Sequence, residues 1–252
     1  MEDIIKVNNL SKNFKAYGKE DTAAVKNVSF VLKEGETLAL VGESGSGKST
    51  IARILTGLIK ATDGDIRIYD KELCKVKKKN ALELYSQIQM VFQNPAESFN
   101  PRKTLGYGIG EALRNRGFSK GAAATKVAEL LEMCGLPPEI AVKYPHQVSG
   151  GQCQRAAIAR ALAVEPKILI CDEATSSLDV TVQKQIIELL DKLRKAQNLS
   201  IIFICHNLAL VQQFCDRVVV LYDGQIVEQG TPNDIINNPQ ADYTKLLVDS
   251  IL

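Results

Sequence analysis

The sequence lacks any apolar run long enough to span a membrane, since no stretch approaches the roughly 18 apolar residues that a membrane helix needs. Its first residues, MEDIIKVNNLSK, also lack the apolar core of a signal peptide. The sequence also lacks a large excess of charge of either sign, because it has 31 Lys and Arg residues and 29 Asp and Glu residues. We therefore expect a soluble chain that reaches a membrane only through a partner. Its net charge does not recruit nucleic acid or acidic lipid, which leaves only a local basic patch to do so.

Paired cysteines are absent too, although the chain has six cysteines and two of them lie in the apolar runs ILICD and IIFIC. The cysteines are Cys74, Cys134, Cys153, Cys171, Cys205 and Cys215, and no two form a Cys-x-x-Cys pair. This pattern favours reduced, mostly buried thiols of a cytosolic protein over disulfides or a zinc site.

What is present is a chain of 252 residues, 45% hydrophobic, in which strand-like runs alternate with helical patterns. The strand-like runs cover residues 4–10, 24–32, 36–42, 64–70, 87–93, 167–173, 199–206 and 217–230. Helical periodicity follows the third run, at residues 49–59, and separates the last runs, at 181–196. Fully apolar strands that alternate with helices are typical of an α/β fold with a parallel sheet covered on both faces.

Residues 94–164 differ from the rest because their periodicity is mostly helical, interrupted by NPAESFNPR and GLPPEIAVKYPHQVSGG. No repeat, low-complexity segment or long linker separates independent domains. We therefore predict one domain over residues 1–252, in which a helical subdomain at 94–164 is inserted between the core segments 1–93 and 165–252.

The stretch GESGSGKST has the pattern G-x-x-x-x-G-K-[ST], and it lies between a predicted strand and a predicted helix. In such a loop backbone N–H groups surround phosphate oxygens, and the following helix adds the positive end of its dipole. Lys48 would lie across the β- and γ-phosphates, with the Ser49 hydroxyl on magnesium. A glycine-rich turn that binds nothing is the weaker alternative. The predicted nucleotide-binding residues of this loop are Gly42, Glu43, Ser44, Gly45, Ser46, Gly47, Lys48, Ser49 and Thr50.

Two carboxylates, Asp172 and Glu173, follow the apolar run ILIC. A strand that ends in two acids is commonplace, but near a phosphate loop the two carboxylates have separate uses. Asp172 can hold the magnesium shell, and Glu173 can orient and deprotonate the attacking water.

A second anion site is indicated by VSGGQ, where Ser149, Gly150 and Gly151 precede a predicted helix. One nucleotide loop does not need a second anion site in the same chain. The two are reconciled if this segment binds a nucleotide that is held mainly by another copy.

The segments GESGSGKST, VSGGQ, ILICDE, SSLD and ICH, in this order and spacing, resemble the nucleotide-binding subunit of an ATP-binding cassette (ABC) transporter over nearly the whole chain. The resemblance implies a P-loop NTPase (RecA-like) core with a mostly parallel sheet, an N-terminal antiparallel β subdomain and an inserted α-helical subdomain. It also implies ATP and Mg²⁺ as cofactors. The function implied is ATP hydrolysis that drives import of a small solute.

The resemblance assigns further site residues. Phe14 matches the aromatic residue that stacks on adenine, and Tyr17 is the second choice. Gln93 matches the glutamine that touches magnesium and the attacking water and senses the membrane partner. Ser149, Gly150, Gly151, Gln152 and Asp179 match segments that reach the nucleotide of the opposite subunit, and His206 matches the histidine at the γ-phosphate. Catalytic roles are thereby expected for Lys48, Gln93, Glu173 and His206, and metal-binding roles for Ser49, Gln93 and Asp172.

The sequence departs from the family pattern at three positions. Val148 stands where leucine is usual, Cys153 where a basic or polar residue is common, and Ser177 where alanine is frequent. None of these changes removes a group that touches nucleotide, so we expect an active site.

The segments FQNPAESFNPRKTLG and YPHQVSGGQCQR resemble the oligopeptide, dipeptide and nickel importers of bacteria. The ending ADYTKLLVDSIL resembles the shorter subunits of nickel or metal-chelate importers. The implied partners are a second ABC ATPase subunit, identical or related, two transmembrane permease subunits and an extracellular solute-binding protein. The implied location is the cytoplasmic face of the bacterial cell membrane.

The main alternative is a non-transport ABC ATPase that acts on DNA or ribosomes. In DNA-repair types, long coiled coils separate the phosphate loop from the segment that corresponds to VSGGQ, the signature segment. Here only about 100 residues without sustained heptads lie between the two. Ribosome-acting types usually carry two cassettes in one chain. A kinase-like P-loop enzyme would leave VSGGQ unexplained.

Overall fold

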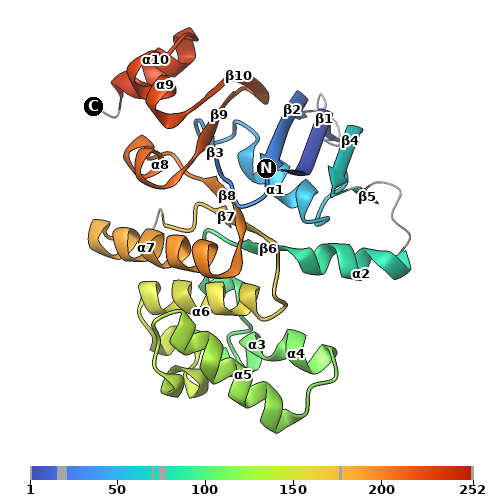
Figure 1. The fold of residues 1–252 in the computed structure, drawn as a ribbon, viewed down its shortest axis with the longest axis vertical. Helices are drawn as coiled ribbons and strands as arrows, with labels where there is room; N and C mark the ends of the chain where they lie inside the picture. Colours follow the sequence, from blue (N-terminus) through green and yellow to red (C-terminus); the bar gives the residue numbers. More distant parts are fainter. Residues whose placement is uncertain (1, 16–21, 70, 74–77, 176–177, 251–252) are drawn as a thin grey trace.

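The computed structural model describes residues 2–15, 22–69, 71–73, 78–175 and 178–250, with the backbone alone at 78–82. Its centre is a six-stranded sheet in the order β10-β9-β3-β8-β7-β6 (Figure 1). The strands are β3 (Thr37–Val41), β6 (Ile88–Val91), β7 (Ile168–Asp172), β8 (Ser200–Ile204), β9 (Arg217–Tyr222) and β10 (Gln225–Gly230). All neighbouring pairs are parallel except β9 and β10. The prediction of a mostly parallel sheet is therefore confirmed.

A second sheet has the order β2-β1-β4-β5 and is antiparallel. Its strands are β1 (Asp3–Phe14), β2 (Thr22–Lys33), β4 (Asp63–Ile68) and β5 (Lys71–Glu72). The antiparallel subdomain is thus not wholly N-terminal, since two of its strands follow the phosphate loop in the chain. The predicted run 217–230 also differs, because Asp223 and Gly224 turn the chain between β9 and β10.

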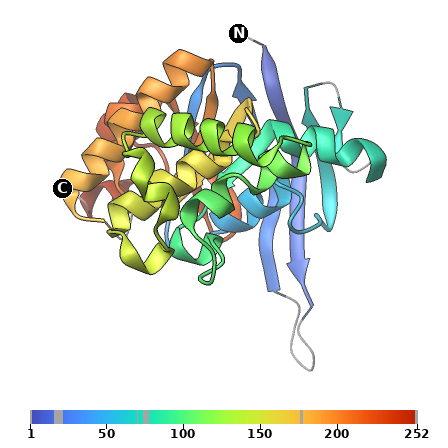
Figure 2. The same ribbon diagram turned by 90° about the horizontal axis from the view of Figure 1, so that it is seen from below.

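The helices gather mainly on one side of the central sheet, opposite β1, β2 and β4 (Figure 2). They are α1 (Lys48–Leu55), α2 (Lys78–Gln87), α3 (Leu105–Ile109), α4 (Glu111–Asn115), α5 (Lys120–Met133), α6 (Gly150–Leu162), α7 (Val180–Gln197), α8 (Leu208–Phe214), α9 (Pro232–Asn237) and α10 (Asp242–Asp249). Short 3₁₀ turns occupy Ala96–Ser98, Pro138–Val142 and Pro145–Gln147. In the described residues no helix has the length and apolar character needed to cross a membrane.

The core divides into two clusters because side chains alternate between the two faces of each strand. Ala39 and Val41 of β3 belong to the cluster shared with helices α3 to α10. Leu38 and Leu40 belong to the cluster shared with α1 and the antiparallel sheet. One face of the central sheet is therefore covered partly by the antiparallel sheet.

The cysteine prediction is confirmed where the structure describes these residues. Cys134, Cys153, Cys171, Cys205 and Cys215 are buried free thiols. Burial raises the pKa of Cys171 and of Cys205 to about 12. Cys74 lies outside the described residues.

Candidate nucleotide site

The phosphate loop runs between β3 and α1, as the sequence predicts, and its glycines are required by close backbone contacts. Gly42 has a φ of 144°, and a Cβ there would lie 2.1 Å from the Leu221 carbonyl oxygen. Gly47 has a φ of 102° and precedes α1, and a Cβ there would lie 2.5 Å from the Ala24 carbonyl oxygen. Only glycine fits these two positions, so β9 and β2 hold the loop at both of its ends.

Lys48 lies in the centre of this loop and is only 4% exposed. Its Nζ donates to the carbonyl oxygens of Gly42 and Glu43, both at 2.7 Å, and to Ser46 Oγ at 3.3 Å. Burial lowers the pKa of Lys48, and the carboxylates of Glu173 and Asp172 oppose that shift. Phosphate is the predicted partner of this lysine; here the carbonyls of its own loop hold the ammonium group.

Ser49 and Asp172, predicted as metal ligands, are brought together across 123 positions of the chain. The Ser49 hydroxyl donates to Asp172 Oδ1 at 2.8 Å, from the first turn of α1 to the end of β7. Asp172 is 5% exposed. Burial raises its pKa, and the hydrogen bond from Ser49 partly offsets the shift.

Gln93 and Glu173, both predicted as catalytic residues, form a second pair. Gln93 Nε2 donates to Glu173 Oε2 at 2.7 Å. Glu173 has a φ of 48°, and its N–H donates to the Ile204 carbonyl oxygen at 3.0 Å, which anchors it at the end of β8. The pairs meet because the carboxyl ends of parallel strands lie at the same edge of a sheet.

A cavity of about 480 Å³ is lined by Ser49 and Asp172 of the first pair and by Gln93 of the second. Arg53 of α1 and Glu97 also line this cavity, and neither residue was predicted from the sequence. Arg53 could have been identified from the sequence, because it stands four residues after Ser49 and therefore lies on the same face of α1.

His206 follows β8 and is exposed. It lines a small cavity together with Glu173, Thr175 and Asn207. The Asn207 side chain caps α8 by accepting from the N–H groups of Ala209 and Leu210. The structure therefore brings His206 and Glu173 to one cavity.

Phe14, the predicted adenine contact, ends β1 with 43% of its surface exposed. The Lys12 ammonium group lies 5.1 Å from the centre of its ring. In the sheet Phe14 pairs with Thr22, two residues before Ala24, whose carbonyl touches Gly47. The ring is thus exposed on the strand pair that borders the phosphate loop. Tyr17, the second choice, lies outside the described residues.

The signature segment lies at the start of α6, where Ser149 forms a capping box with Gln152. A Cβ on Gly150 would lie 3.4 Å from Leu178, and one on Gly151 would lie 2.7 Å from Val182. Asp179 caps α7 by accepting from the Val182 N–H at 2.9 Å. The two segments expected to reach an opposite subunit therefore lie side by side at the starts of α6 and α7. Ser177 lies outside the described residues.

One residue that contacts the phosphate loop was not predicted. Tyr243 Oη, in α10, accepts from the Glu43 N–H at 2.9 Å. No local pattern connects positions 43 and 243, so only the packing of the C-terminal helix places them together.

This chain matches the family described as ABC transporter over residues 25–176. It is 47% identical over 230 residues to the oligopeptide transport ATP-binding protein OppF of Salmonella typhimurium (strain LT2), covering 90% of this chain and 69% of that protein. It is 44% identical over 260 residues to the dipeptide transport ATP-binding protein DppD of Bacillus subtilis (strain 168), covering 100% of this chain and 77% of that protein.

Among solved structures, the ATP-binding cassette MJ0796, a dimer in a post-hydrolysis state with bound ADP and Pi, has a TM-score of 0.83 at 31% identity. The match covers 90% of this chain and 98% of that one. The predicted resemblance and fold class are confirmed, and this chain belongs to the ABC transporter family, as an ATP-binding subunit whose ATP hydrolysis is coupled to transport.

Proposed function

We propose that Gly42–Thr50 bind the phosphates of ATP, that Ser49, Asp172 and Gln93 hold Mg²⁺, and that Glu173 is the general base. The observation that carries this proposal is the meeting of two hydrogen-bonded pairs, Ser49 with Asp172 and Gln93 with Glu173, next to the phosphate loop. One pair has the groups for a cation and the other for a water molecule.

The residues present fit a magnesium ion. Ser49 Oγ and Asp172 Oδ1 are hard oxygen donors 2.8 Å apart, and Gln93 lines the same cavity. Within the described residues no group of three His, Cys, Asp or Glu side chains could hold a metal ion alone. This agrees with magnesium, which commonly takes one or two carboxylates and completes its shell with phosphate oxygens and water. When bound, Mg²⁺ supplies neutralisation of charge on the β- and γ-phosphates.

The remaining steps belong to the side chains. Lys48 holds its positive charge at the centre of the loop, where phosphate oxygens carry negative charge. Glu173 accepts a proton from the attacking water, and the Gln93 amide orients that carboxylate. His206, at the cavity shared with Glu173, donates to the γ-phosphate. Phe14 stacks on adenine, which its exposed ring allows.

The signature residues Ser149, Gly150, Gly151 and Gln152, together with Asp179, complete the site of a second ATPase subunit. Support comes from the exposure of Ser149, Gly150 and Asp179 at neighbouring helix starts and from the dimer that MJ0796 forms. Helix α6 has 13 residues, so its N-terminal amides carry a dipole suited to a phosphate. Closure of two such subunits on ATP, and their opening after hydrolysis, would move the helical inserts.

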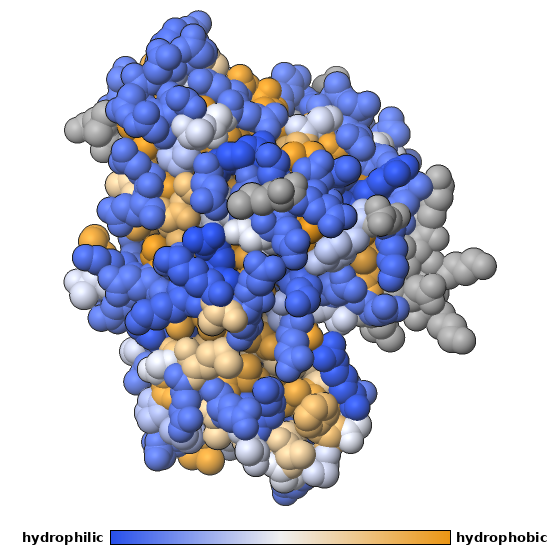
Figure 3. All heavy atoms as spheres, in the orientation of Figure 1, coloured by the Kyte–Doolittle hydropathy of each residue, from blue (hydrophilic) through white to orange (hydrophobic). Residues whose placement is uncertain are grey.

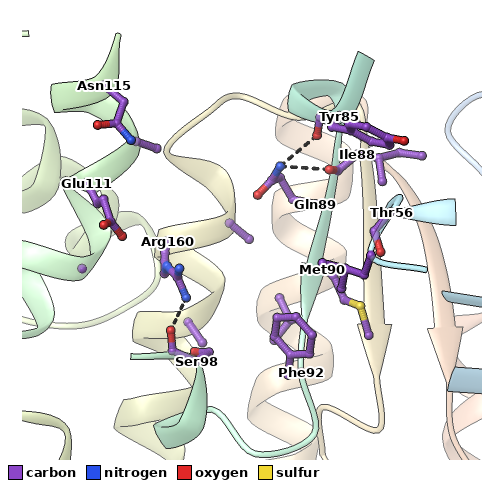
Figure 4. A pocket seen from close by; sticks show the side chains of 16 residues that line it. Thr56, Tyr85, Ile88, Gln89, Met90, Phe92, Ser98, Glu111, Asn115 and Arg160 are labelled. Atoms are coloured by element: carbon purple, nitrogen blue, oxygen red, sulfur yellow. Dashed lines mark hydrogen bonds between the residues drawn. The ribbon is translucent and has the colours of Figure 1, made fainter. Parts of the chain in front are cut away.

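A groove of about 310 Å³ between the core and the insert is the site where a permease subunit docks (Figure 4). Glu111 and Asn115 border it on the side of α4, while Gln89 and Phe92 border it on the side of β6. Arg160 of α6 lies between the two sides, bonded to the Ser98 carbonyl oxygen in the segment that follows Gln93. A segment in the groove would thus contact the NPAESFNPR stretch.

Hydrophobic surface is more extensive over the insert than over the upper part of the molecule in the view of Figure 3. Exposed large hydrophobic residues of the insert are Tyr107, Phe118, Met133, Val142 and Tyr144. Such surface suits contact with protein partners at the cytoplasmic face of the cell membrane.

Peptides are the solute class that the similarity to OppF and DppD supports, with nickel or a metal chelate as the alternative. Uptake then involves two permease subunits and an extracellular solute-binding protein. A coiled-coil arm of the DNA-repair type has no counterpart in the described part of the insert, where the longest helix, α5, has 14 residues.

The test blocks the groove without touching the nucleotide site. Ala112 of α4 lines the groove, so Ala112→Arg should prevent ATP-driven uptake of a labelled dipeptide or tripeptide into vesicles that carry the whole transporter. ATP hydrolysis by the isolated chain should stay within about twofold of the parent, because surface changes away from a site have small effects.

The matched control is Ala124→Arg, on an exposed position of α5 outside the groove, which should preserve uptake. Normal peptide uptake with Ala112→Arg would reject the groove as the docking site. Uptake of nickel chelates in place of peptides would reject the peptide assignment.

A further inference from the structure

The C-terminal helix α10 reaches back to the start of the phosphate loop. Tyr243 Oη accepts a hydrogen bond of 2.9 Å from the Glu43 N–H, the residue after Gly42. The two residues stand 200 positions apart. Of the element YT in ADYTKLLVDSIL, the threonine is fully buried, and the tyrosine faces the loop.

The tyrosine is held from two sides. Its ring lies 4.3 Å from the Tyr222 ring, between ring centres, at an angle of 32°. Tyr222 ends β9, and the preceding residue, Leu221, is the one whose carbonyl oxygen lies against Gly42. The end of β9 therefore supports both the loop and the tyrosine that bonds to it.

The start of α10 is also anchored. The Glu228 carboxylate of β10 accepts from the Gln240 N–H at 2.9 Å and from the Ala241 N–H at 3.0 Å. Thr244 and Val248 are buried on the inner face of the helix. The Tyr243 hydroxyl is thus carried by a helix fixed to the central sheet.

Glu43 links this tyrosine to the lysine of the loop. Its N–H donates to Tyr243 Oη, while its carbonyl oxygen accepts from Lys48 Nζ at 2.7 Å. A displacement of Glu43 would therefore move an acceptor that holds Lys48. Burial raises the pKa of Tyr243, so the hydroxyl stays neutral at neutral pH and accepts through an oxygen lone pair.

We propose that Tyr243 is a positioning residue of the phosphate loop: its hydroxyl fixes Glu43, and through Glu43 the ammonium group of Lys48, in the geometry that receives ATP. This inference rests on the proposed phosphate-binding role of Gly42–Thr50. Pre-organisation of this kind lowers the cost of ordering the loop when the nucleotide binds.

The test is Tyr243→Phe, which removes the hydroxyl and keeps the ring on Tyr222. Because Glu43 is exposed, water can satisfy its N–H, so the fold should survive. We expect Kd for ATP and for ADP, measured by calorimetry on the isolated chain, to rise about 3- to 10-fold, the usual range for one hydrogen bond. KM for ATP should rise in parallel, with kcat and the Tm of the nucleotide-free chain nearly unchanged.

The matched control is Tyr222→Phe, which removes a hydroxyl from the other ring of the pair and should leave Kd unchanged. The proposal is wrong if Tyr243→Phe binds ATP as the parent does, or if Tyr222→Phe weakens binding equally. A fall in Tm and kcat at constant KM would show a merely structural role. Lys48→Ala, measured in parallel, separates the two hypotheses, because parent-like ATP binding by that variant would overturn the phosphate-loop assignment itself.

Discussion

The phosphate loop and the signature segment both place glycines at the start of a helix, yet their surroundings differ. The loop at residues 42–50 is contacted by backbone carbonyls of β9 and β2 and by the Tyr243 hydroxyl of α10. Lys48 is buried in this loop. Ser149 and Gly150 are exposed, and the hydrogen bonds of Ser149 with Gln152 stay within its own helix start. The loop is therefore enclosed by its own chain, whereas Ser149 and Gly150 of the signature lie at the surface.

Under the proposed function, this difference explains how one chain can carry two anion sites. A nucleotide held only by the loop would lack donors on its exposed side, and we propose that the signature of a second subunit supplies them. The half-site built within the chain should therefore govern binding. The half-site presented outward should govern dimer closure and hydrolysis.

The largest expected effect concerns the half-site built within the chain, the phosphate loop. Lys48→Ala removes the cation at the centre of the loop, so ATP hydrolysis should fall at least about 100-fold. ATP binding should weaken greatly as well. The measurement is phosphate release with Mg²⁺, and the control is Lys60→Ala, an exposed lysine outside the loop. Hydrolysis by Lys48→Ala at the parent rate would contradict the proposed site.

The next effect separates the two halves. Glu173→Gln keeps the shape and the bond to Gln93 but loses the proton acceptor, so hydrolysis should fall about 100-fold or more. ATP should still bind, and a closed dimer should accumulate in light scattering. The isolated chain, or the chain with its partner ATPase if it pairs only with that, is the sample.

Adding Ser149→Arg to Glu173→Gln should abolish that dimer by bulk and misplaced charge while ATP still binds to the loop. The matched control is Ser119→Arg in the same background, because Ser119 caps α5 as Ser149 caps α6. Both changes remove a cap of about 1 kcal/mol. A dimer that survives Ser149→Arg, or one lost equally with Ser119→Arg, would refute the shared site.

The smallest expected effect concerns the folding stability that is lost by burying Asp172 in the half-site built within the chain. The pKa of Asp172 is raised by burial, so the folded state holds this proton more tightly than the unfolded state. Stability is therefore lost as the pH rises through the folded-state pKa. Without nucleotide at pH 7.5, Asp172→Asn should raise Tm by about 2–4 °C, as roughly 1 kcal/mol would.

The difference in Tm should narrow as the pH is lowered toward that raised pKa. Asp191 provides the opposite case, since the hydrogen bond from Lys195 lowers its pKa and makes its charged form stabilising. Asp191→Asn should therefore lower Tm at pH 7.5 and lose its effect in acid. A lower Tm for Asp172→Asn at neutral pH would show that Asp172 is not held at a cost.

Short stretches of the sequence are enough to predict the local elements of this protein. The apolar runs of β3, β7 and β8 can be recognised as strands from the sequence alone, because a continuous apolar run is typical of a strand buried on both faces. Each of these strands is indeed buried along its length. GESGSGKST specifies a strand, loop and helix through its glycines, and Ser149 and Asp179 specify helix starts through their side chains. These features depend on residues a few positions apart, which local physics decides.

Contacts between residues far apart in the chain became known only from the folded structure. The order of the strands brings Ser49 to Asp172 and Gln93 to Glu173, over separations of 123 and 80 positions. The division of the antiparallel sheet around the phosphate loop, and the contact of Tyr243 with Glu43, follow from packing in the same way. A contact between distant residues leaves no periodicity in the sequence, since the chain between them can take any path that closes the core.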